Sequence, residues 1–310
     1  MIAQADGAHT PEDDNHGQAV QLARPIHRVT AVFNTTTDRH RDCLEKIRHF
    51  LASRGVQLFE TAVDWKACPV LPPDVQHPDL VIVIGGDGTF LRTARCFLHS
   101  QVPLVGVNTG HLGFLTRIEA DTIELHLENL LAGKYRVQPR MLLAHTLDVA
   151  DEALALNDIV VKNANPSQMA RLSLFINNAL VAVYDTDGMI FATPIGSTAY
   201  NLAAGGPVIS PDIEAICITP ICPHSFSAKP IVVPAHKRLR LESDARNRHP
   251  LLIAVDGQDV GSLPPGGVLE VTRSLHTLPM MKLGKDTDNF YRLLQKKLNW
   301  GYNPREHEGV

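Results

Sequence analysis

The sequence lacks several patterns that mark common classes of protein. No apolar run reaches the roughly 18 residues that a membrane-spanning helix requires, and the amino terminus has no basic-then-apolar layout typical of a signal peptide. A formal net charge of -4 gives no basic surplus of the kind that proteins bound to nucleic acid normally carry. We therefore expect a cytoplasmic protein that binds neither a membrane nor a nucleic acid.

Cysteine and histidine patterns are also missing. The five cysteines are odd in number and contain no Cys-x-x-Cys pair, which argues against a disulfide framework. The 15 histidines include no His-Glu-x-x-His motif, and no His/Cys set has the spacing of a zinc site. We therefore assign no residue as a metal ligand.

The sequence is long enough for about two domains, because its 310 residues exceed the roughly 100–200 residues of a typical domain. Residues 1–24 are polar, acidic and aperiodic, and predict a mobile tail. Residues 25–133 alternate strand and helix patterns, which favours a Rossmann-like α/β domain with a parallel sheet. The helices expected there cover residues 38–54, 89–98 and 119–132.

Residues 134–285 carry many short β-type runs separated by turn formers, which predicts an all-β, sandwich-like domain. Among its predicted strands are residues 141–149 and 268–271. Residues 286–300 return to a helical pattern, and we expect this helix to pack back on the first domain.

A glycine-rich turn follows the most apolar predicted strand. Residues 80–84 have no polar alternation, as expected of a strand buried on both faces of a parallel sheet. Three glycines within residues 85–88 allow backbone N–H groups to converge on an anion. The turn has neither the Gly-x-Gly-x-x-Gly fingerprint nor the Lys-Ser/Thr of a P-loop. Asp87 would repel a bound phosphate, which suggests that it is a base or a metal ligand; alone, the turn is equally compatible with a structural role.

Residues 108–115 follow the next predicted strand, over residues 104–107. They should lie on the same sheet edge as the glycine-rich turn, because ligands of open α/β sheets bind outside the carboxyl ends of the strands. The sequence therefore predicts a ligand site at this edge.

A second polar segment lies in the predicted β domain. Residues 196–198 could begin a helix whose N–H groups and hydroxyls bind phosphate or ribose, and Tyr200 could stack on a base. Upstream, Asn157 and Asp158 place an amide and a carboxylate at the start of a strand, a suitable pair for adjacent ribose hydroxyls. Each feature alone is more often structural, but together they favour a nucleotide site.

Three segments in this order and at these separations closely resemble the NAD kinase family: residues 85–89 (Gly-Gly-Asp-Gly-Thr), residues 157–158 (Asn-Asp) and residues 193–207. The resemblance runs from about residue 28 to about residue 300. The first turn alone is less specific, because lipid kinases and 6-phosphofructokinases have similar turns, whereas residues 193–207 are much more diagnostic.

The resemblance implies transfer of the γ-phosphate of ATP to the 2′-hydroxyl of the adenosine ribose of NAD, giving NADP and ADP, with a divalent cation such as Mg²⁺. It implies that Asp87 accepts the hydroxyl proton in an interdomain cleft and that Asn157 and Asp158 hold ribose hydroxyls. It also implies a homo-oligomer. Further nucleotide contacts are implied for Gly88, Arg92, Asp187, Thr198, Ala199, Tyr200, Asn201, Leu202, Ala203 and Gln258.

Two positions depart from a simple transfer of roles. Family members often have Glu where this chain has Asp158, and Asp185 leaves the phosphate donor open between ATP and inorganic polyphosphate.

Two other functions compete with NAD phosphorylation. A lipid kinase of the diacylglycerol or sphingosine type would share the glycine-rich turn but would need an apolar acceptor pocket. A non-catalytic NAD(P)-binding regulator would not require Asp87.

Overall fold

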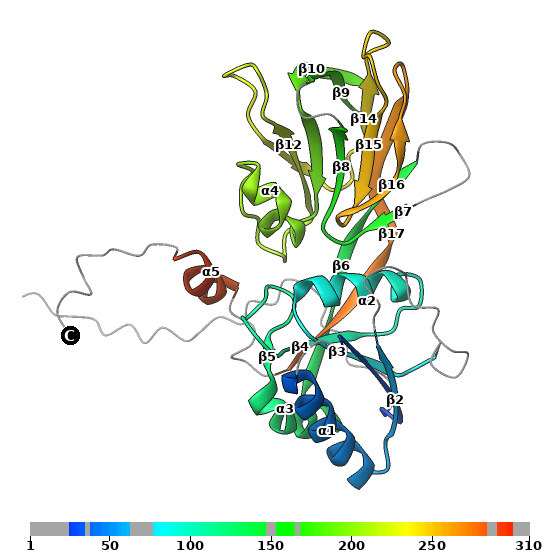
Figure 1. The fold of residues 1–310 in the computed structure, drawn as a ribbon, viewed down its shortest axis with the longest axis vertical. Helices are drawn as coiled ribbons and strands as arrows, with labels where there is room; N and C mark the ends of the chain where they lie inside the picture. Colours follow the sequence, from blue (N-terminus) through cyan, green and yellow to red (C-terminus); the bar gives the residue numbers. More distant parts are fainter. Residues whose placement is uncertain are drawn as a thin grey trace, which may run out of the picture.

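The computed structural model describes residues 25–34, 38–62, 77–146, 153–164, 168–283 and 290–299. The predicted tail over residues 1–24 and both ends of the predicted helix over residues 286–300 lie outside these ranges. The predicted fold class is confirmed, because a mixed α/β unit is joined to an antiparallel β unit (Figure 1). None of the helices that the structure describes has the length and apolar character needed to cross a membrane.

Parallel strands with helices on both faces form the first domain. Strand β1 pairs with β2 and β3, and β3 pairs with β4, all in parallel. Strands β3 and β4 are buried along their whole length, which explains their unbroken apolar sequence. The elements are β1 (Arg28–Phe33), α1 (Asp38–Ser53), β2 (Gln57–Ala62), β3 (Leu80–Ile84), α2 (Asp87–Phe97), β4 (Leu104–Asn108), β5 (Ile118–Glu119), the 3₁₀ helix η2 (Ala120–Thr122) and α3 (Ile123–Leu131).

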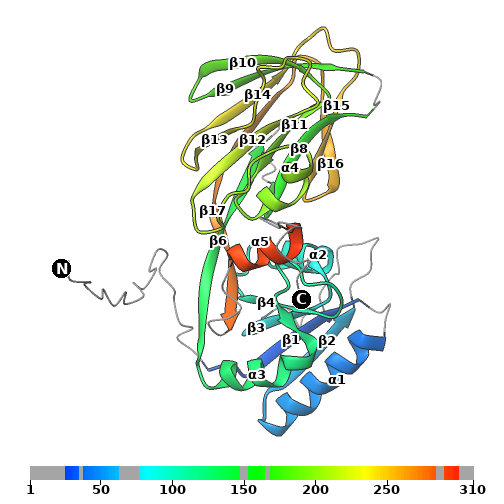
Figure 2. The same ribbon diagram turned by 90° about the vertical axis from the view of Figure 1, so that its left-hand side faces the viewer.

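Two long antiparallel strands, β6 (Tyr135–Thr146) and β17 (Val268–Leu283), run through both domains (Figures 1 and 2). Met280 of β17 pairs in parallel with Leu104 of β4, so the first domain and one layer of the second share a continuous sheet. The ladder between β6 and β17 is interrupted once, between Arg273 and Thr277.

The second domain is a sandwich of two sheet layers. One layer continues from β17 through β14 and β9 to β10, and the other has the strand order β13-β12-β11-β8-β15-β16. Alternate apolar residues from both layers form one buried cluster, as in other sandwiches. The remaining elements are β7 (Ala153–Ala155), β8 (Asp158–Asn163), β9 (Ala170–Ile176), β10 (Ala179–Thr186), β11 (Gly188–Ala192), the 3₁₀ helix η3 (Gly196–Thr198), α4 (Tyr200–Ala203), β12 (Ala215–Ile221), β13 (Ile231–Pro234), β14 (Leu239–Ser243), β15 (Leu251–Val255), β16 (Gln258–Leu263) and α5 (Phe290–Leu298).

Several predicted boundaries are wrong. Helix α2 begins at Asp87, two residues before the predicted start, and α3 covers less than the predicted residues 119–132. Strand β6 begins six residues before its predicted start, and β17 ends twelve residues after its predicted end. Each strand packs against different neighbours in the two domains, so its apolar residues do not follow one alternating pattern along its whole length. The helix expected after Gly196 is only one 3₁₀ turn followed by a single short turn of α-helix.

One buried cluster joins the two domains. It combines Phe90 and Phe97 of α2 with Leu142 of β6, Leu156 of the β7–β8 turn and Leu278 of β17, each at most 1% exposed. Helix α2 lies at the junction in Figure 1. Its apolar face is thus fixed against both the parallel sheet and the strands that lead to the β domain, which holds its amino terminus in place.

Truncating this cluster should destabilise the whole chain. Leu142→Ala removes a fully buried side chain and should lower the free energy of unfolding by about 2–5 kcal/mol. Urea denaturation should give a lower midpoint for this variant than for Val260→Ala, a control at a side chain that is 42% exposed. Equal midpoints for the two variants would contradict a shared core around Leu142.

Candidate active site

The glycine-rich turn lies at the carboxyl end of β3 and leads directly into α2. Gly85 has a φ of 152°, and a Cβ there would lie 2.7 Å from Oγ1 of Thr89, so only glycine fits. Asp87 is the first residue of α2, where the helix dipole favours a negative charge.

The carboxylate of Asp87 binds the loop that follows β4. Its Oδ2 accepts a hydrogen bond from the N–H of Phe114 at 2.8 Å. Its Oδ1 accepts hydrogen bonds from the N–H groups of Leu115 (3.0 Å) and Thr116 (3.1 Å) and from Oγ1 of Thr116 (3.3 Å). We call residues 113–116 the anchored loop. The predicted meeting of residues 85–88 and 108–115 at one sheet edge is therefore observed.

Gly113 makes this anchoring possible. A Cβ at Gly113 would lie 1.9 Å from Oδ1 of Asp87 and 2.5 Å from Oγ1 of Thr116, closer than atoms can approach. The sequence analysis placed this segment correctly but did not identify backbone N–H groups as the partners of Asp87. The sequence offers only a weak indication of this contact, which is an acidic residue at a helix start together with a glycine-containing loop after the next strand.

Asn157 and Asp158, which we call the acceptor pair after the role that the resemblance implies, lie at the turn between β7 and β8. Both residues are buried, with 8% and 4% exposure. The carboxylate of Asp256, in the turn between β15 and β16, accepts hydrogen bonds from the N–H groups of Leu156, Asn157 and Asp158. Asp256 was not predicted as a site residue.

Two carboxyl groups therefore lie close together at this turn, that of Asp158 buried and that of Asp256 half-buried. Burial, and secondly the charge of Asp256, raise the pKa of Asp158 to about 7. Burial also raises the pKa of Asp256, against the effect of its three N–H donors and the more distant charge of Arg95. A carboxyl group with a raised pKa takes up a proton more readily, and the protonated form can donate as well as accept a hydrogen bond.

The segment after β11 clamps the same turn from its other side. The N–H of Thr193 donates to the carbonyl of Asn157 at 2.8 Å, and its Oγ1 donates to the carbonyl of Leu156 at 2.6 Å. A Cβ at Gly196 would lie 2.0 Å from the carbonyl oxygen of Asn157, so the chain passes this turn at a distance that only glycine allows. Residues 193–196 and the acceptor pair thus form one unit.

Other predicted residues of this segment have different surroundings. The side chain of Tyr200 is 42% exposed, and Ala203 is also exposed. Ala199 and Leu202 are half-buried. The hydroxyl of Thr198 donates a hydrogen bond to the carbonyl of Ile195 at 3.2 Å. Asn201 is fully buried. Its amide donates to the carbonyls of Ser197 and Pro207 and accepts from Thr219, so its side chain supports the segment from inside.

Three predicted residues lie close in sequence to Asp87 or to Asp256. Gly88 is exposed on the first turn of α2, Arg92 is half-buried on the same helix, and Gln258 is exposed at the start of β16, beside Asp256. The structure does not bring Asp187 to the site. Asp187 precedes β11 while Thr193 follows it, and an extended strand of this length separates them by roughly 15–20 Å.

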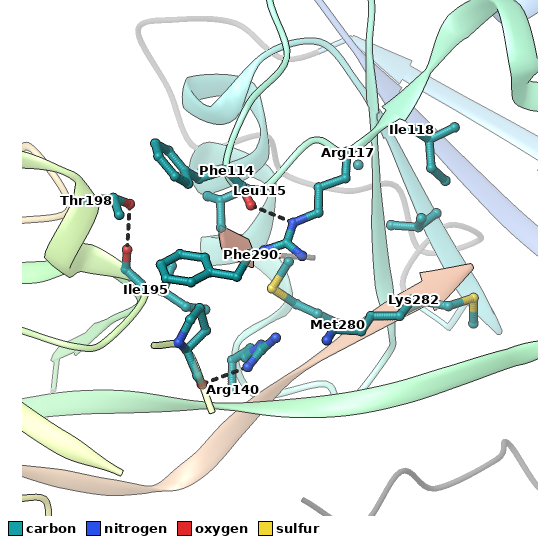
Figure 3. A pocket seen from close by; sticks show the side chains of 14 residues that line it. Phe114, Leu115, Arg117, Ile118, Arg140, Ile195, Thr198, Met280, Lys282 and Phe290 are labelled. Atoms are coloured by element: carbon teal, nitrogen blue, oxygen red, sulfur yellow. Dashed lines mark hydrogen bonds between the residues drawn. The ribbon is translucent and has the colours of Figure 1, made fainter. Parts of the chain in front are cut away.

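A cavity between the domains connects the anchored loop with the β-domain segment. Phe114 and Leu115 line it from the first domain, and Ile195 and Thr198 line it from the second (Figure 3). Phe290 of α5 closes one side, with its ring centroid 6.4 Å from that of Phe114, and Lys297 lies 5.1 Å above the Phe114 ring. Helix α5 therefore packs back on the first domain, as predicted.

The residues described do not form a resident metal site. No group of three His, Cys, Asp or Glu side chains in these ranges could hold a cation. Both oxygens of Asp87 already accept hydrogen bonds from the anchored loop. A divalent cation would have to take most of its oxygen ligands from a nucleotide and from water.

An α/β unit with a glycine-rich turn at a strand end, joined to a β sandwich with a polar turn, is an arrangement compatible with a kinase. Family comparisons make the assignment specific. The model of the ATP-NAD kinase N-terminal domain matches residues 69–135, and that of the ATP-NAD kinase C-terminal domain matches residues 156–283. The chain belongs to the NAD kinase family, and the lipid kinase alternative has no support.

Individual relatives agree over nearly the whole chain. An NAD kinase of Moorella thermoacetica is 38% identical over 291 residues, covering 91% of this chain and 93% of the relative. One of Porphyromonas gingivalis is 40% identical, covering 76% and 80%. Among solved structures, yeast NADH kinase complexed with NADH has the same fold, with a TM-score of 0.81 at 23% identity over 96% of this chain and 94% of that chain. An NAD kinase from Archaeoglobus fulgidus in complex with ATP gives a TM-score of 0.72 at 26% identity, covering 86% and 98%.

Displacing Asp87 from the anchored loop should cost stability. In Gly113→Ala the new Cβ forces the Asp87 carboxylate away from its donors, so the free energy of unfolding should fall by about 1–3 kcal/mol. Gly110→Ala is the matched control, because a Cβ there meets no atom within 4 Å. Similar denaturation curves for the two variants would show that the anchoring bonds contribute little.

The pair of Asp158 and Asp256 should make stability depend on pH. Because the pKa of Asp158 is raised in the folded state, its contribution to stability is complete below the unfolded pKa near 4 and is lost as the pH rises to about 7. Asp158→Asn mimics the protonated form. Its unfolding free energy, relative to the parent, should therefore increase by at least about 1 kcal/mol between about pH 5 and about pH 8. A difference that stays constant over this range would exclude a raised pKa.

Proposed function

We propose that this protein transfers the γ-phosphate of ATP to the 2′-hydroxyl of the adenosine ribose of NAD, giving NADP and ADP. Asp87 is the proton acceptor, and Asn157 with Asp158 binds the acceptor ribose. The observation that carries this proposal is that Asp87, at the start of α2, binds the N–H groups of Phe114 and Leu115, two residues that line the cavity between the domains.

The hydrogen bonds of Asp87 leave room for this role. Oδ1 accepts three hydrogen bonds from the anchored loop, whereas Oδ2 accepts only that of Phe114 among the described residues. A carboxylate oxygen has two lone pairs, so Oδ2 can accept a hydrogen bond from a substrate hydroxyl and then its proton. The anchored loop fixes the direction of the carboxylate, which favours a reactive geometry.

Phosphoryl transfer needs positioning and charge stabilisation more than covalent chemistry. The backbone N–H groups at the start of α2 can face the transferred phosphoryl group. A divalent cation would enter with the triphosphate and neutralise its charge. Exposed Tyr200 and the Phe114 ring at the cavity wall offer aromatic surface to the nucleotide.

Relatives support the choice of substrates. The Archaeoglobus fulgidus NAD kinase was solved with ATP, and the Moorella thermoacetica relative is named an NAD kinase. Polyphosphate as an alternative donor, a homo-oligomeric state and a cytoplasmic location remain predictions.

The activity test uses purified protein with magnesium, NAD and either ATP or polyphosphate, and measures NADP with an NADP-specific dehydrogenase. Asp87→Asn keeps the shape of the turn but removes the charge and the proton acceptor. It should lower kcat by about 10²–10⁴-fold, with a much smaller change in the NAD dissociation constant. Asp38→Asn is the control, because the Asp38 side chain is exposed at the start of α1.

Two outcomes would revise the role of Asp87. Recovery of the variant at high magnesium or manganese would identify Asp87 as a metal ligand instead of a base. Near-native turnover of Asp87→Asn would remove the catalytic assignment.

A further inference from the structure

We propose that Asp256 is a positioning residue for the acceptor: its carboxylate holds the backbone of residues 156–158 so that Asn157 and Asp158 face the ribose of NAD. This role rests on the proposed function. Asp256 would act through the acceptor pair and need not touch either substrate.

The contact is made by three successive backbone N–H groups. Oδ2 of Asp256 accepts from Leu156 at 2.9 Å, and Oδ1 accepts from Asn157 at 2.7 Å and from Asp158 at 3.2 Å. In return, the N–H of Asp256 donates to the carbonyl of Asp158 at 3.0 Å. Four hydrogen bonds therefore join two turns that are about 100 residues apart in sequence.

The hairpin itself does not require an acid at this position. Asp256 and Gly257 are the two loop residues between β15 and β16, with φ values of 48° and 77°. Such a two-residue turn with two positive φ angles favours Asn-Gly as well as Asp-Gly. Asn would thus serve the turn equally well. What distinguishes Asp is a second acceptor oxygen, and the three converging N–H groups use both oxygens.

The acid is also costly where it lies. Its burial raises its own pKa, and its charge raises that of Asp158. A fold selected for stability alone would avoid placing a half-buried carboxyl group beside a buried one, because each charged form loses hydration. Locally unfavourable arrangements of this kind are typical of functional sites.

Asp256 also connects the acceptor turn to the helix that carries Asp87. Arg95, in the last turn of α2, is close enough to lower the pKa of Asp256, while Asp87 begins the same helix. The packing of α2 in the shared buried cluster with Leu156 fixes these elements relative to each other. Loss of the Asp256 carboxylate should therefore displace the acceptor hydroxyl from Asp87 without disturbing the phosphate turn.

The test compares Asp256→Asn with the parent in steady-state kinetics. Asn keeps the side-chain shape and tolerates the positive φ, but its NH₂ group would face a backbone N–H where a carboxylate oxygen now accepts. The KM for NAD should rise at least about tenfold, kcat should fall, and the KM for ATP should stay within about twofold. Asp259→Asn is the matched control on the same hairpin, since Asp259 is exposed.

A second variant separates positioning from turn formation. Asp256→Gly removes the carboxylate, while glycine adopts the positive φ without strain. It should reproduce the selective rise in the KM for NAD. Equal increases in both KM values, or failure of both variants to fold, would assign Asp256 a purely structural role and overturn the proposal. A parent protein that produces no NADP would overturn the proposed function, whereas an active parent with an unchanged KM for NAD in both variants would overturn only the positioning role.

Discussion

The geometry of the site depends on the contact between the Asp87 carboxylate and the anchored loop. A loop that follows a buried strand has backbone N–H groups without ladder partners, and such groups must be satisfied. Here one charged side chain satisfies three of them. Hydrogen bonds to a charged acceptor are roughly twice as strong as neutral ones. The same bonds fix the direction of the carboxylate and the position of the Phe114 ring in the cavity wall.

Acidic residues in this protein have very different surroundings, and these differences agree with the separate roles that we propose for them. Asp87 is half-buried at a helix start and surrounded by donors, which suits an anion that accepts a proton from a correctly placed hydroxyl. Asp158 is buried beside another acid, and its raised pKa favours a carboxyl group that exchanges hydrogen bonds with ribose. The backbone therefore determines what each carboxyl group can do.

Much of the fold could be predicted from local patterns, while the contacts that complete the site could not. The unbroken apolar runs of β3 and β4 are enough to predict two buried parallel strands. Ligands of open α/β sheets bind outside the carboxyl ends of the strands, which predicts a site at the glycine-rich turn. The partners of Asp87 are main-chain N–H groups, which leave no trace in side-chain identity. Asp256 has the hairpin signal Asp-Gly, but its contact with Leu156 depends on the pairing of β15 with β8. The sequence does not show that Asn201 is buried, because a polar side chain is normally expected at the surface and a single buried amide does not change the pattern of apolar residues around it.

The interruption of the β6–β17 ladder has a mechanical consequence. Pairing is regular on both sides of residues 274–276, and Leu275 there is fully exposed. A paired two-stranded ribbon resists sliding and torsion, but a bulge lets it bend. The two domains are thus joined by a paired ribbon and a shared buried cluster, and not by a single linker, so any bending of the ribbon would be concentrated at residues 274–276.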